Sequence, residues 1–234
     1  SEHNALFQAL EGVERKDIAK VYLTASGGPF YGTKMKKDVS PEDALAHPVW
    51  KMGKKITVDS ATMLNKSFEV IEAHHLFSLP TEKIDVLIHP EAVVHGMVEL
   101  VDGTIKGILS VPDMKIPISF VLHYPCRSDH CWQHIDFDKI GKLHFYPVER
   151  DADWFLLAQQ AIEKKGSFPV VFNSANEEAV ELFLEGKVKF QEIIPLVKAV
   201  IGAHTYKRDI SLEDVFYFNN WAKEQTKEFV GVKK

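Results

Sequence analysis

The stretch from residue 60 to residue 69 has the side chains needed to hold an anion and a metal ion close together. On a helix, Asn65 and Glu69 lie four residues apart and Lys66 and Glu69 lie three apart, so an amide, an ammonium and a carboxylate can meet. If that helix begins near Ser60, its free N–H groups and positive dipole end favour a phosphate there. The alternative is a solvated helix flank on which Lys66 and Glu69 form a weak surface pair.

A second candidate for phosphate binding is the Ser26-Gly27-Gly28 turn, which follows a predicted buried strand over residues 20–25. Glycine has no Cβ, so the backbone amides of this turn can approach a ligand closely. The alternative is an ordinary turn without a ligand. Because Glu69 offers hard oxygen ligands, these residues suggest a phosphorylated small molecule bound together with Mg²⁺ or Mn²⁺.

A loop over residues 47–55 precedes the predicted helix and must position it. The loop carries Trp50 and Met52, which either close over a ligand or anchor the loop to the core. A β-branched run at residues 56–58 follows the loop.

The helix after this run is predicted to be capped by Asp59 or Ser60, because a short side-chain oxygen can accept from the free amides of a first turn. Its inward face is predicted from residues at helical spacing: Leu64, Phe68, Ile71 and His75. The polar residues predicted to fall outside this stripe are Asn65, Lys66, Glu69 and Glu72.

The first half of the chain otherwise reads as a small sheet with flanking helices. Strands are predicted over residues 20–25 and 84–89. Asp102-Gly103 is a favoured two-residue turn, so residues 93–101 and 104–111 are predicted to form a β-hairpin. His89 and His95 are interpreted as structural histidines from their spacing, since neither has a metal-ligand partner four residues on.

The second half is predicted to be helical. Besides the helix that begins near Ser60, helices are predicted over residues 3–10, a segment after residue 112, 153–165, 178–185, 190–203 and 212–230. Ser174 and Glu177 form a predicted capping box for the helix at 178–185, and Ser211 is the predicted cap of the last helix. The fold class is therefore an α/β (α+β) catalytic domain over 1–123, a connector over 124–150 and a C-terminal helical bundle over 151–234.

Composition excludes several classes of function. The formal net charge is −5 and no basic stripe is present, which argues against nucleic acid as a partner. No apolar run approaches the roughly 18 residues needed to cross a membrane. Cys126 and Cys131 show no zinc-site or disulfide-scaffold pattern, which favours a reducing compartment. No G-x-G-x-x-G or Walker pattern occurs, so no dinucleotide or nucleotide triphosphate is predicted to bind through such a loop.

Six segments in order carry a family resemblance: SEHNALFQAL, LTASGGPF, HPVWKMGKKITVDSATMLNK, VLIHPEAVVHGMVE, VPDMKIPI and NSANEEAVELFL. The chain resembles the 1-deoxy-D-xylulose 5-phosphate reductoisomerases of the non-mevalonate isoprenoid pathway. The resemblance implies an enzyme dependent on NADPH and on Mg²⁺ or Mn²⁺, which rearranges and reduces this sugar phosphate to 2-C-methyl-D-erythritol 4-phosphate. It also implies a homodimer in the bacterial cytoplasm, with a plastid as the alternative location.

The resemblance also implies roles for individual residues. The metal ligands would be Glu2 and Glu69, together with an aspartate that would directly precede Ser1. The implied phosphate-binding residues are Ser26, Ser60, Asn65 and Lys66, and Ser1 and Ser26 would contact substrate oxygens. The implied catalytic set is Glu69, His47 and His95. Trp50 and Met52 match the loop that closes over the substrate, and Gly27 and Gly28 are assigned to cofactor binding.

The family has three parts, and this chain resembles only the last two, the catalytic and C-terminal domains. The chain opens without Met, which suggests a cut inside a longer protein. NADPH is expected to bind mainly to the N-terminal domain, so we expect the chain alone to be inactive. Two alternatives stay open: an oxidoreductase acting on another sugar phosphate, and a fragment that binds phosphate or an inhibitor without turnover.

Overall fold

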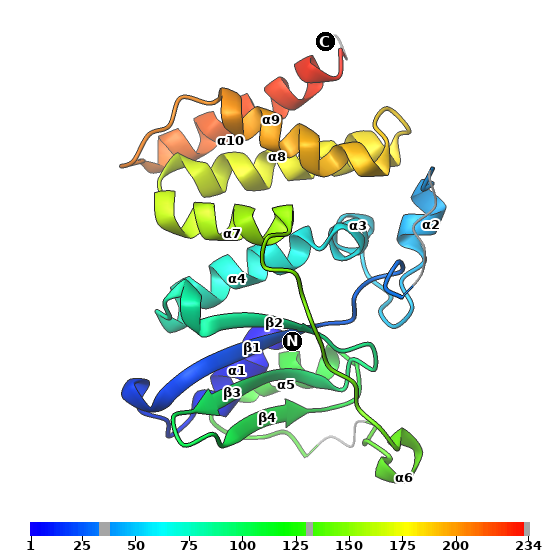
Figure 1. Ribbon diagram of the computed structural model, residues 1–234, viewed down its shortest axis with the longest axis vertical. Helices are drawn as coiled ribbons and strands as arrows, with labels where there is room; N and C mark the ends of the chain where they lie inside the picture. The colour runs from blue at the N-terminus through cyan, green and yellow to red at the C-terminus, as the bar shows by residue number, and fades with distance from the viewer. Residues whose placement is uncertain (33–37, 130–132, 232–234) are drawn as a thin grey trace. The chain divides into compact units, whose positions relative to one another are not determined.

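The computed structural model describes residues 1–32, 38–129 and 133–231, and these residues pack as two compact units (Figure 1). The first unit is made of Ser1–Gly27 and Glu72–Glu149, and the second of Gly28–Ile71 and Arg150–Lys234. In this packing, residues 28–71 group with the C-terminal helices. The predicted division into a catalytic domain over 1–123, a connector over 124–150 and a C-terminal bundle over 151–234 stays a prediction. Cys131 lies outside the described residues.

The first unit contains a five-stranded sheet in the order β4-β3-β1-β2-β5. Its strands are β1 (Ile18–Ala25), β2 (Ile84–Ile88), β3 (Val94–Leu100), β4 (Ile105–Leu109) and β5 (Tyr146–Pro147). β1 and β2 are parallel, whereas the β3–β4 hairpin and the β1–β3 pair are antiparallel. The two predicted strands and the predicted hairpin are thus confirmed, and the fold class is mixed α/β. The short strand β5 lies in the segment predicted as a connector and pairs with β2.

Helix α1 (Glu2–Leu10) packs against this sheet and confirms the predicted first helix. It buries Ala5, Leu6 and Ala9. Gly96 on β3 permits this close approach, because a Cβ there would lie 3.3 Å from both the Glu2 carbonyl oxygen and the Ala5 Cβ. The unit also contains α5 (Lys115–His123), α6 (Phe137–Ile140) and the 3₁₀ turns Arg15–Asp17 and Thr81–Lys83.

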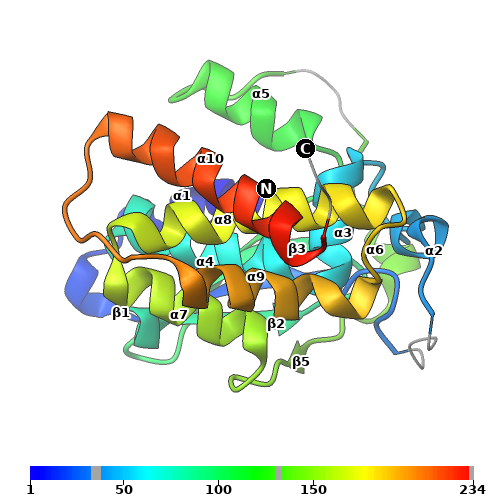
Figure 2. The same ribbon diagram turned by 90° about the horizontal axis from the view of Figure 1, so that it is seen from above.

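The second unit is helical. Its helices are α2 (Pro41–Leu45), α3 (Lys54–Thr62), α7 (Asp153–Lys164), α8 (Ser167–Leu184), α9 (Ile193–Ala203) and α10 (Leu212–Phe229), with a 3₁₀ turn at Phe190–Glu192. The first residues of α4 (Leu64–Phe77) belong to it as well. Helix α8 is central: it contacts α3, α7, α9 and α10, and Figure 2 shows it between α9 and α10. The largest buried side chains of this unit include Phe155, Phe168, Phe172 and Phe183.

Two predicted helix starts are wrong. The β-branched residues 56–58 lie inside α3, whose N-cap is Gly53, so neither Asp59 nor Ser60 caps a helix. Burial of Thr57 and Val58 against the rest of the unit overrides their weak preference for strands.

The capping box predicted at Ser174 and Glu177 does not open a helix either. It lies in the middle of α8, which begins at Ser167, and the Ser174 Oγ instead donates to Asn219 Oδ1 at 2.9 Å. Pro169 lies in the first turn of α8, where its missing N–H costs nothing. By contrast, the predicted cap Ser211 is confirmed at the start of α10, where it forms a capping box with Asp214.

Within the part of the chain that the structure describes, no helix is long and apolar enough to cross a membrane.

Candidate functional site

The joint between α3 and α4 brings the predicted phosphate-binding residues of the second unit together. Met63 separates the two helices in a left-handed conformation, with φ 64°. The Thr62 hydroxyl accepts from the Leu64 amide at 3.3 Å and so caps the start of α4. Ser60 therefore lies in the last turn of α3, whereas Asn65 and Lys66 lie in the first turn of α4. Ser60 thus precedes the joint and Asn65 and Lys66 follow it, and the assignment of these three residues to an anion site stays a prediction.

Asn65, Lys66 and Glu69 form a compact polar cluster on α4. Lys66 Nζ donates to Glu69 Oε2 at 2.6 Å, and Asn65 Nδ2 donates to Glu69 Oε1 at 2.5 Å. Lys66 and Glu69 are only 4% and 8% exposed. The interpretation as a solvated surface pair is therefore wrong, and both carboxylate oxygens of Glu69 are held by donors.

The predicted inward face of α4 is confirmed at Leu64 and wrong at His75, while Phe68 and Ile71 are half-buried. The fully buried residues at helical spacing are Leu64, Ser67, Val70 and Ala73, whereas His75 is exposed. The buried stripe is rotated by about one residue toward Lys66 and Glu69. Small side chains let the helix approach its neighbours, and the Ser67 hydroxyl donates to the Trp154 carbonyl oxygen at 2.6 Å. This rotation is what buries the ion pair.

The glycine turn meets the end of α3 within the second unit. Gly28 has φ +67°, and a Cβ at this position would lie 2.9 Å from the Ser60 carbonyl oxygen. Both the backbone conformation and the space require glycine here. The two predicted phosphate-binding elements are thus neighbours at Gly28 and Ser60. Ser26 and Gly27 belong to the first unit and follow the end of β1.

Asp59 is a buried carboxylate one residue before Ser60. Its Oδ2 accepts from Lys55 Nζ at 2.6 Å, and its Oδ1 accepts from Asn176 Nδ2 of α8 at 2.8 Å. Burial raises the pKa of Asp59, and the two hydrogen-bond donors oppose that shift. Sequence reasoning considered Asp59 only as a cap and Asn176 only as part of a capping box. Asn176 could have been noticed, because it follows Phe172 by four residues on the apolar stripe of its helix.

His47 organises the loop that carries Trp50 and Met52. Its Nδ1 accepts from the Val49 amide at 3.1 Å and from the Trp50 amide at 2.9 Å, which places the proton of the neutral ring on Nε2. Partial burial lowers the pKa of His47. Trp50 and Met52 are half-buried. His47 therefore fixes the backbone at the start of this loop.

In the first unit, Ser1 and Glu2 lie at the start of α1. The Ser1 hydroxyl donates to Glu2 Oε2 at 2.8 Å, and the Glu2 side chain is 22% exposed. Glu2 and Glu69 offer the hard carboxylate oxygens that Mg²⁺ and Mn²⁺ prefer, so their chemistry fits such an ion. Among residues 1–32, 38–129 and 133–231, no group of three or more His, Cys, Asp or Glu side chains is arranged to hold a metal. The two-glutamate assignment stays a prediction.

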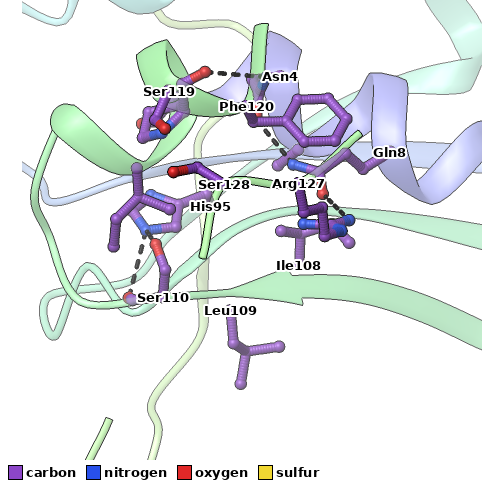
Figure 3. A pocket seen from close by; sticks show the side chains of 14 residues that line it. Asn4, Gln8, His95, Ile108, Leu109, Ser110, Ser119, Phe120, Arg127 and Ser128 are labelled. Carbon is purple, nitrogen blue, oxygen red and sulfur yellow. Dashed lines mark hydrogen bonds between the residues drawn. The ribbon is translucent and has the colours of Figure 1, made fainter. Parts of the chain in front are cut away.

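His95 lines a pocket of about 170 Å³ on the same unit, where polar side chains lie among apolar ones (Figure 3). Ser110 Oγ lies 2.9 Å from His95 Nε2 at one end of the pocket, and Arg127 donates to Gln8 at 2.7 Å at the other. Burial lowers the pKa of His95, although the nearby charge of Glu2 opposes this.

His89 is structural, as predicted. Its Nε2 accepts from the Val93 and Val94 amides, both at 3.1 Å, while its Nδ1 lies 2.8 Å from the His144 carbonyl oxygen. The ring also stacks on Phe145. With both nitrogens engaged by the backbone, His89 holds the turn after β2 in place.

Comparison with known proteins decides the family. Two family models match the chain: "1-deoxy-D-xylulose 5-phosphate reductoisomerase C-terminal domain" over residues 1–77 and "DXP reductoisomerase C-terminal domain" over residues 109–225. The chain belongs to the 1-deoxy-D-xylulose 5-phosphate reductoisomerase family. The resemblance carried by the six sequence segments is thereby confirmed.

The curated reductoisomerases that the chain matches are longer than the chain itself. The chain is 46% identical to the 1-deoxy-D-xylulose 5-phosphate reductoisomerase of Acetivibrio thermocellus over 98% of its own length, but it spans only 61% of that relative. The corresponding enzyme of Thermodesulfovibrio yellowstonii gives the same identity, with 99% and 61% covered.

Solved reductoisomerase structures share the fold. The Zymomonas mobilis enzyme in complex with NADPH matches with a TM-score of 0.89 and 39% identity, over 98% of this chain and 60% of that one. A reductoisomerase in complex with NADPH, fosmidomycin and magnesium matches with a TM-score of 0.88 and 35% identity, over 99% and 62% of the two chains.

Proposed function

We propose that this chain supplies the metal- and phosphate-binding side chains of a 1-deoxy-D-xylulose 5-phosphate reductoisomerase. The whole protein would convert 1-deoxy-D-xylulose 5-phosphate to 2-C-methyl-D-erythritol 4-phosphate with NADPH, in the non-mevalonate route to isoprenoids. One observation carries the proposal: a buried amide–carboxylate–ammonium cluster at Asn65, Glu69 and Lys66, in a chain of this family. The NADPH, fosmidomycin and magnesium bound to a structural relative support it.

The chain's residues divide the work. Lys66 and Asn65 hold the substrate phosphate together with Ser60 and Ser26. Binding energy at this remote group orients the reacting end of the substrate. Lys66 contributes the positive charge, and Glu69 accepts one of the three N–H donors of its ammonium group.

Carboxylates and histidines serve the reacting end. Glu2 and Glu69 are the proposed ligands of Mg²⁺ or Mn²⁺, and Ser1 contacts the substrate oxygens. When bound, the metal polarises the substrate carbonyl and NADPH supplies hydride. His95, whose pKa burial lowers, is neutral at pH 7 and can accept a hydrogen bond from the substrate or donate one.

The loop that His47 organises completes the proposed site. Trp50 and Met52 cover the substrate and exclude water from it. Gly27 and Gly28 leave the backbone open to the phosphate or to the cofactor. The homodimeric state and the bacterial cytoplasmic location rest on the family resemblance alone and belong to this proposal.

Calorimetric titration with inorganic phosphate and with 1-deoxy-D-xylulose 5-phosphate tests the proposal. Lys66→Ala should weaken the binding of each ligand by roughly 1.5–3 kcal/mol, which is the range for a hydrogen bond to a charged group and corresponds to about 10- to 150-fold. Lys187→Ala is the matched control, because Lys187 is an exposed lysine of the same unit that lies outside the proposed site. Equal affinities for the wild type and Lys66→Ala would contradict the proposal.

Binding of phosphate without turnover is the second candidate for these 234 residues. It rests on the printed sequence, which contains no G-x-G-x-x-G motif through which a dinucleotide would bind. A measurement of NADPH consumption, described in the Discussion, separates the two candidates.

A further inference from the structure

Asp59 and Asn176 form a buried contact between α3 and α8 that the proposed chemistry does not use. Asp59 is 2% exposed and Asn176 is fully buried. Asn176 Nδ2 donates to Asp59 Oδ1 at 2.8 Å, while Lys55 Nζ occupies the other carboxylate oxygen at 2.6 Å. Both oxygens of a buried charge are thus paired, as a buried carboxylate requires.

The amide of Asn176 serves Asp59 alone. Within the described residues, Asn176 Oδ1 is the buried side-chain atom that has no hydrogen-bond partner. Leaving an acceptor unpaired in the core costs stability, so an apolar residue would suit this position better if packing were all that mattered. The orientation of the amide, with its N–H groups toward Asp59, provides the one contact that offsets this cost.

The position of Asp59 fixes the neighbouring residues of the phosphate site. Ser60 is the next residue, and its carbonyl oxygen packs directly against Gly28. The Thr62 hydroxyl donates to the Asp59 carbonyl oxygen at 3.2 Å and also accepts from the Leu64 amide that starts α4. A shift of Asp59 would therefore move Ser60 and the first turn of α4 together.

We propose that Asp59 and Asn176 are positioning residues for phosphate binding. Their contact holds the last turn of α3 against the central helix α8, so that Ser60 lies beside Gly28 and beside the turn that carries Asn65 and Lys66. This inference rests on the proposed phosphate site and adds two residues to it that do not touch the ligand.

Ser174 provides a matched control for a purely structural role. It lies two residues from Asn176 on α8, is 1% exposed, and donates a partly buried hydrogen bond to Asn219 of α10 at 2.9 Å. Ser174→Ala therefore removes one hydrogen bond from the same helix and leaves the residues of α3 unchanged. Both Ser174→Ala and Asn176→Leu should lower the Tm.

Calorimetric titration with inorganic phosphate, at a temperature at which every variant is folded, tests the proposal. Asn176→Leu keeps the number and branching of the side chain's heavy atoms but removes its donor, and it should weaken phosphate binding about tenfold, whereas Ser174→Ala should change it less than about twofold. The exchange variant Asp59→Asn/Asn176→Asp restores an amide–carboxylate pair and should recover most of the affinity. Wild-type affinity in Asn176→Leu, or equal losses in Asn176→Leu and Ser174→Ala, would overturn the proposal.

A second readout needs no ligand. The backbone amide resonance of Ser60 should shift in Asn176→Leu and return toward its wild-type position in the exchange variant, but should not move in Ser174→Ala. An unmoved Ser60 resonance in Asn176→Leu would overturn the positioning role. The two proposals can fail separately. If Lys66→Ala leaves phosphate binding unchanged while the Ser60 resonance responds as expected, the proposed phosphate site is refuted, but the role of the contact between α3 and α8 in positioning Ser60 is supported.

Discussion

Lys66 Nζ lies 2.6 Å from Glu69 Oε2, and both side chains are buried. Glu69 is thus shared between two tasks in the proposed function, because the carboxylate that would bind a metal is the one that neutralises the phosphate-binding ammonium. Asn65 holds the other oxygen of the same carboxylate. Phosphate and metal binding should therefore respond to one residue in opposite directions.

Glu69→Gln should raise the affinity for inorganic phosphate, by roughly threefold to tenfold, because it removes the negative charge that pairs with Lys66 and keeps an acceptor oxygen. Calorimetry with phosphate measures this. Glu72→Gln is the control, since it changes a more exposed carboxylate on the same helix. A lower phosphate affinity in Glu69→Gln would mean that Glu69 orients Lys66 rather than competes for it.

The chain should bind Mn²⁺ weakly. The proposed ligands in this chain are Glu2 and Glu69, and two carboxylates supply little charge to offset dehydration of the ion. Lys66 Nζ also donates to Glu69 Oε2, so the ion would have to displace this contact. The paramagnetic signal of free Mn²⁺ reports the binding. Micromolar affinity that is lost in Glu69→Gln would show that two glutamates suffice.

The chain alone should not oxidise NADPH in the presence of 1-deoxy-D-xylulose 5-phosphate. Its sequence contains no G-x-G-x-x-G motif through which a dinucleotide would bind. The NADPH absorbance of the purified, mass-verified chain is the measurement, with the reductoisomerase of Acetivibrio thermocellus as the positive control. Steady NADPH consumption would refute the expectation and would exclude binding without turnover.

Gly28→Ala should impair phosphate binding as well as stability. Gly28 and Gly32 both have a positive φ, +67° and +70°, but an added methyl at Gly28 would lie 2.9 Å from the Ser60 carbonyl oxygen, whereas one at Gly32 would meet nothing within 4 Å. Gly32→Ala should thus cost about 1 kcal/mol from backbone strain alone, and Gly28→Ala should cost more. Urea denaturation and phosphate calorimetry measure the two effects. If Gly28→Ala and Gly32→Ala lost the same stability and Gly28→Ala kept its phosphate affinity, the turn at Gly28 would have adjusted without displacing Ser60.

Stability should fall as the pH drops below 6.5, in part because of His95. Burial lowers the pKa of His95 from 6.5, so between its folded pKa and 6.5 the unfolded chain binds more protons than the folded one. Its contribution is therefore fully present above pH 6.5 and is lost as the pH falls toward the folded value. NMR titration of the ring should give a midpoint below 6.5. The free energy of unfolding of His95→Gln should change less with pH in this window than that of the wild type. An identical pH dependence in the two proteins would contradict the contribution assigned to His95.

The sequence predicts the site's residue types better than their burial. Asn65, Lys66 and Glu69 meet as their spacing indicates, because helix geometry alone sets that contact. The buried face of α4 cannot be found in the same way. The spacing of large apolar residues such as Leu64 and Phe68 indicates one stripe. The structure also buries the small residues Ser67 and Ala73, which the hydrophobic pattern does not mark.

Long-range contacts explain the other differences. Ser174 and Glu177 match a capping box in sequence, but Ser174 is buried against α10, and only the packed unit shows that. The contact between Asp59 and Asn176 joins residues 117 positions apart, beyond any local pattern. Strands and hairpin are predictable because their alternation and the Asp102-Gly103 turn are local signals.

The left-handed residue between α3 and α4 has a consequence for how this family can change over time. Met63 has a positive φ, which glycine and asparagine adopt more readily than methionine, so the backbone there should tolerate replacement by either residue. Removing or adding one residue at the joint should not be tolerated. Each residue rotates the following helix by roughly 100°, so Lys66 and Glu69 would no longer face the same neighbours. At this joint, natural variants should therefore differ in the identity of the residue but keep the number of residues constant.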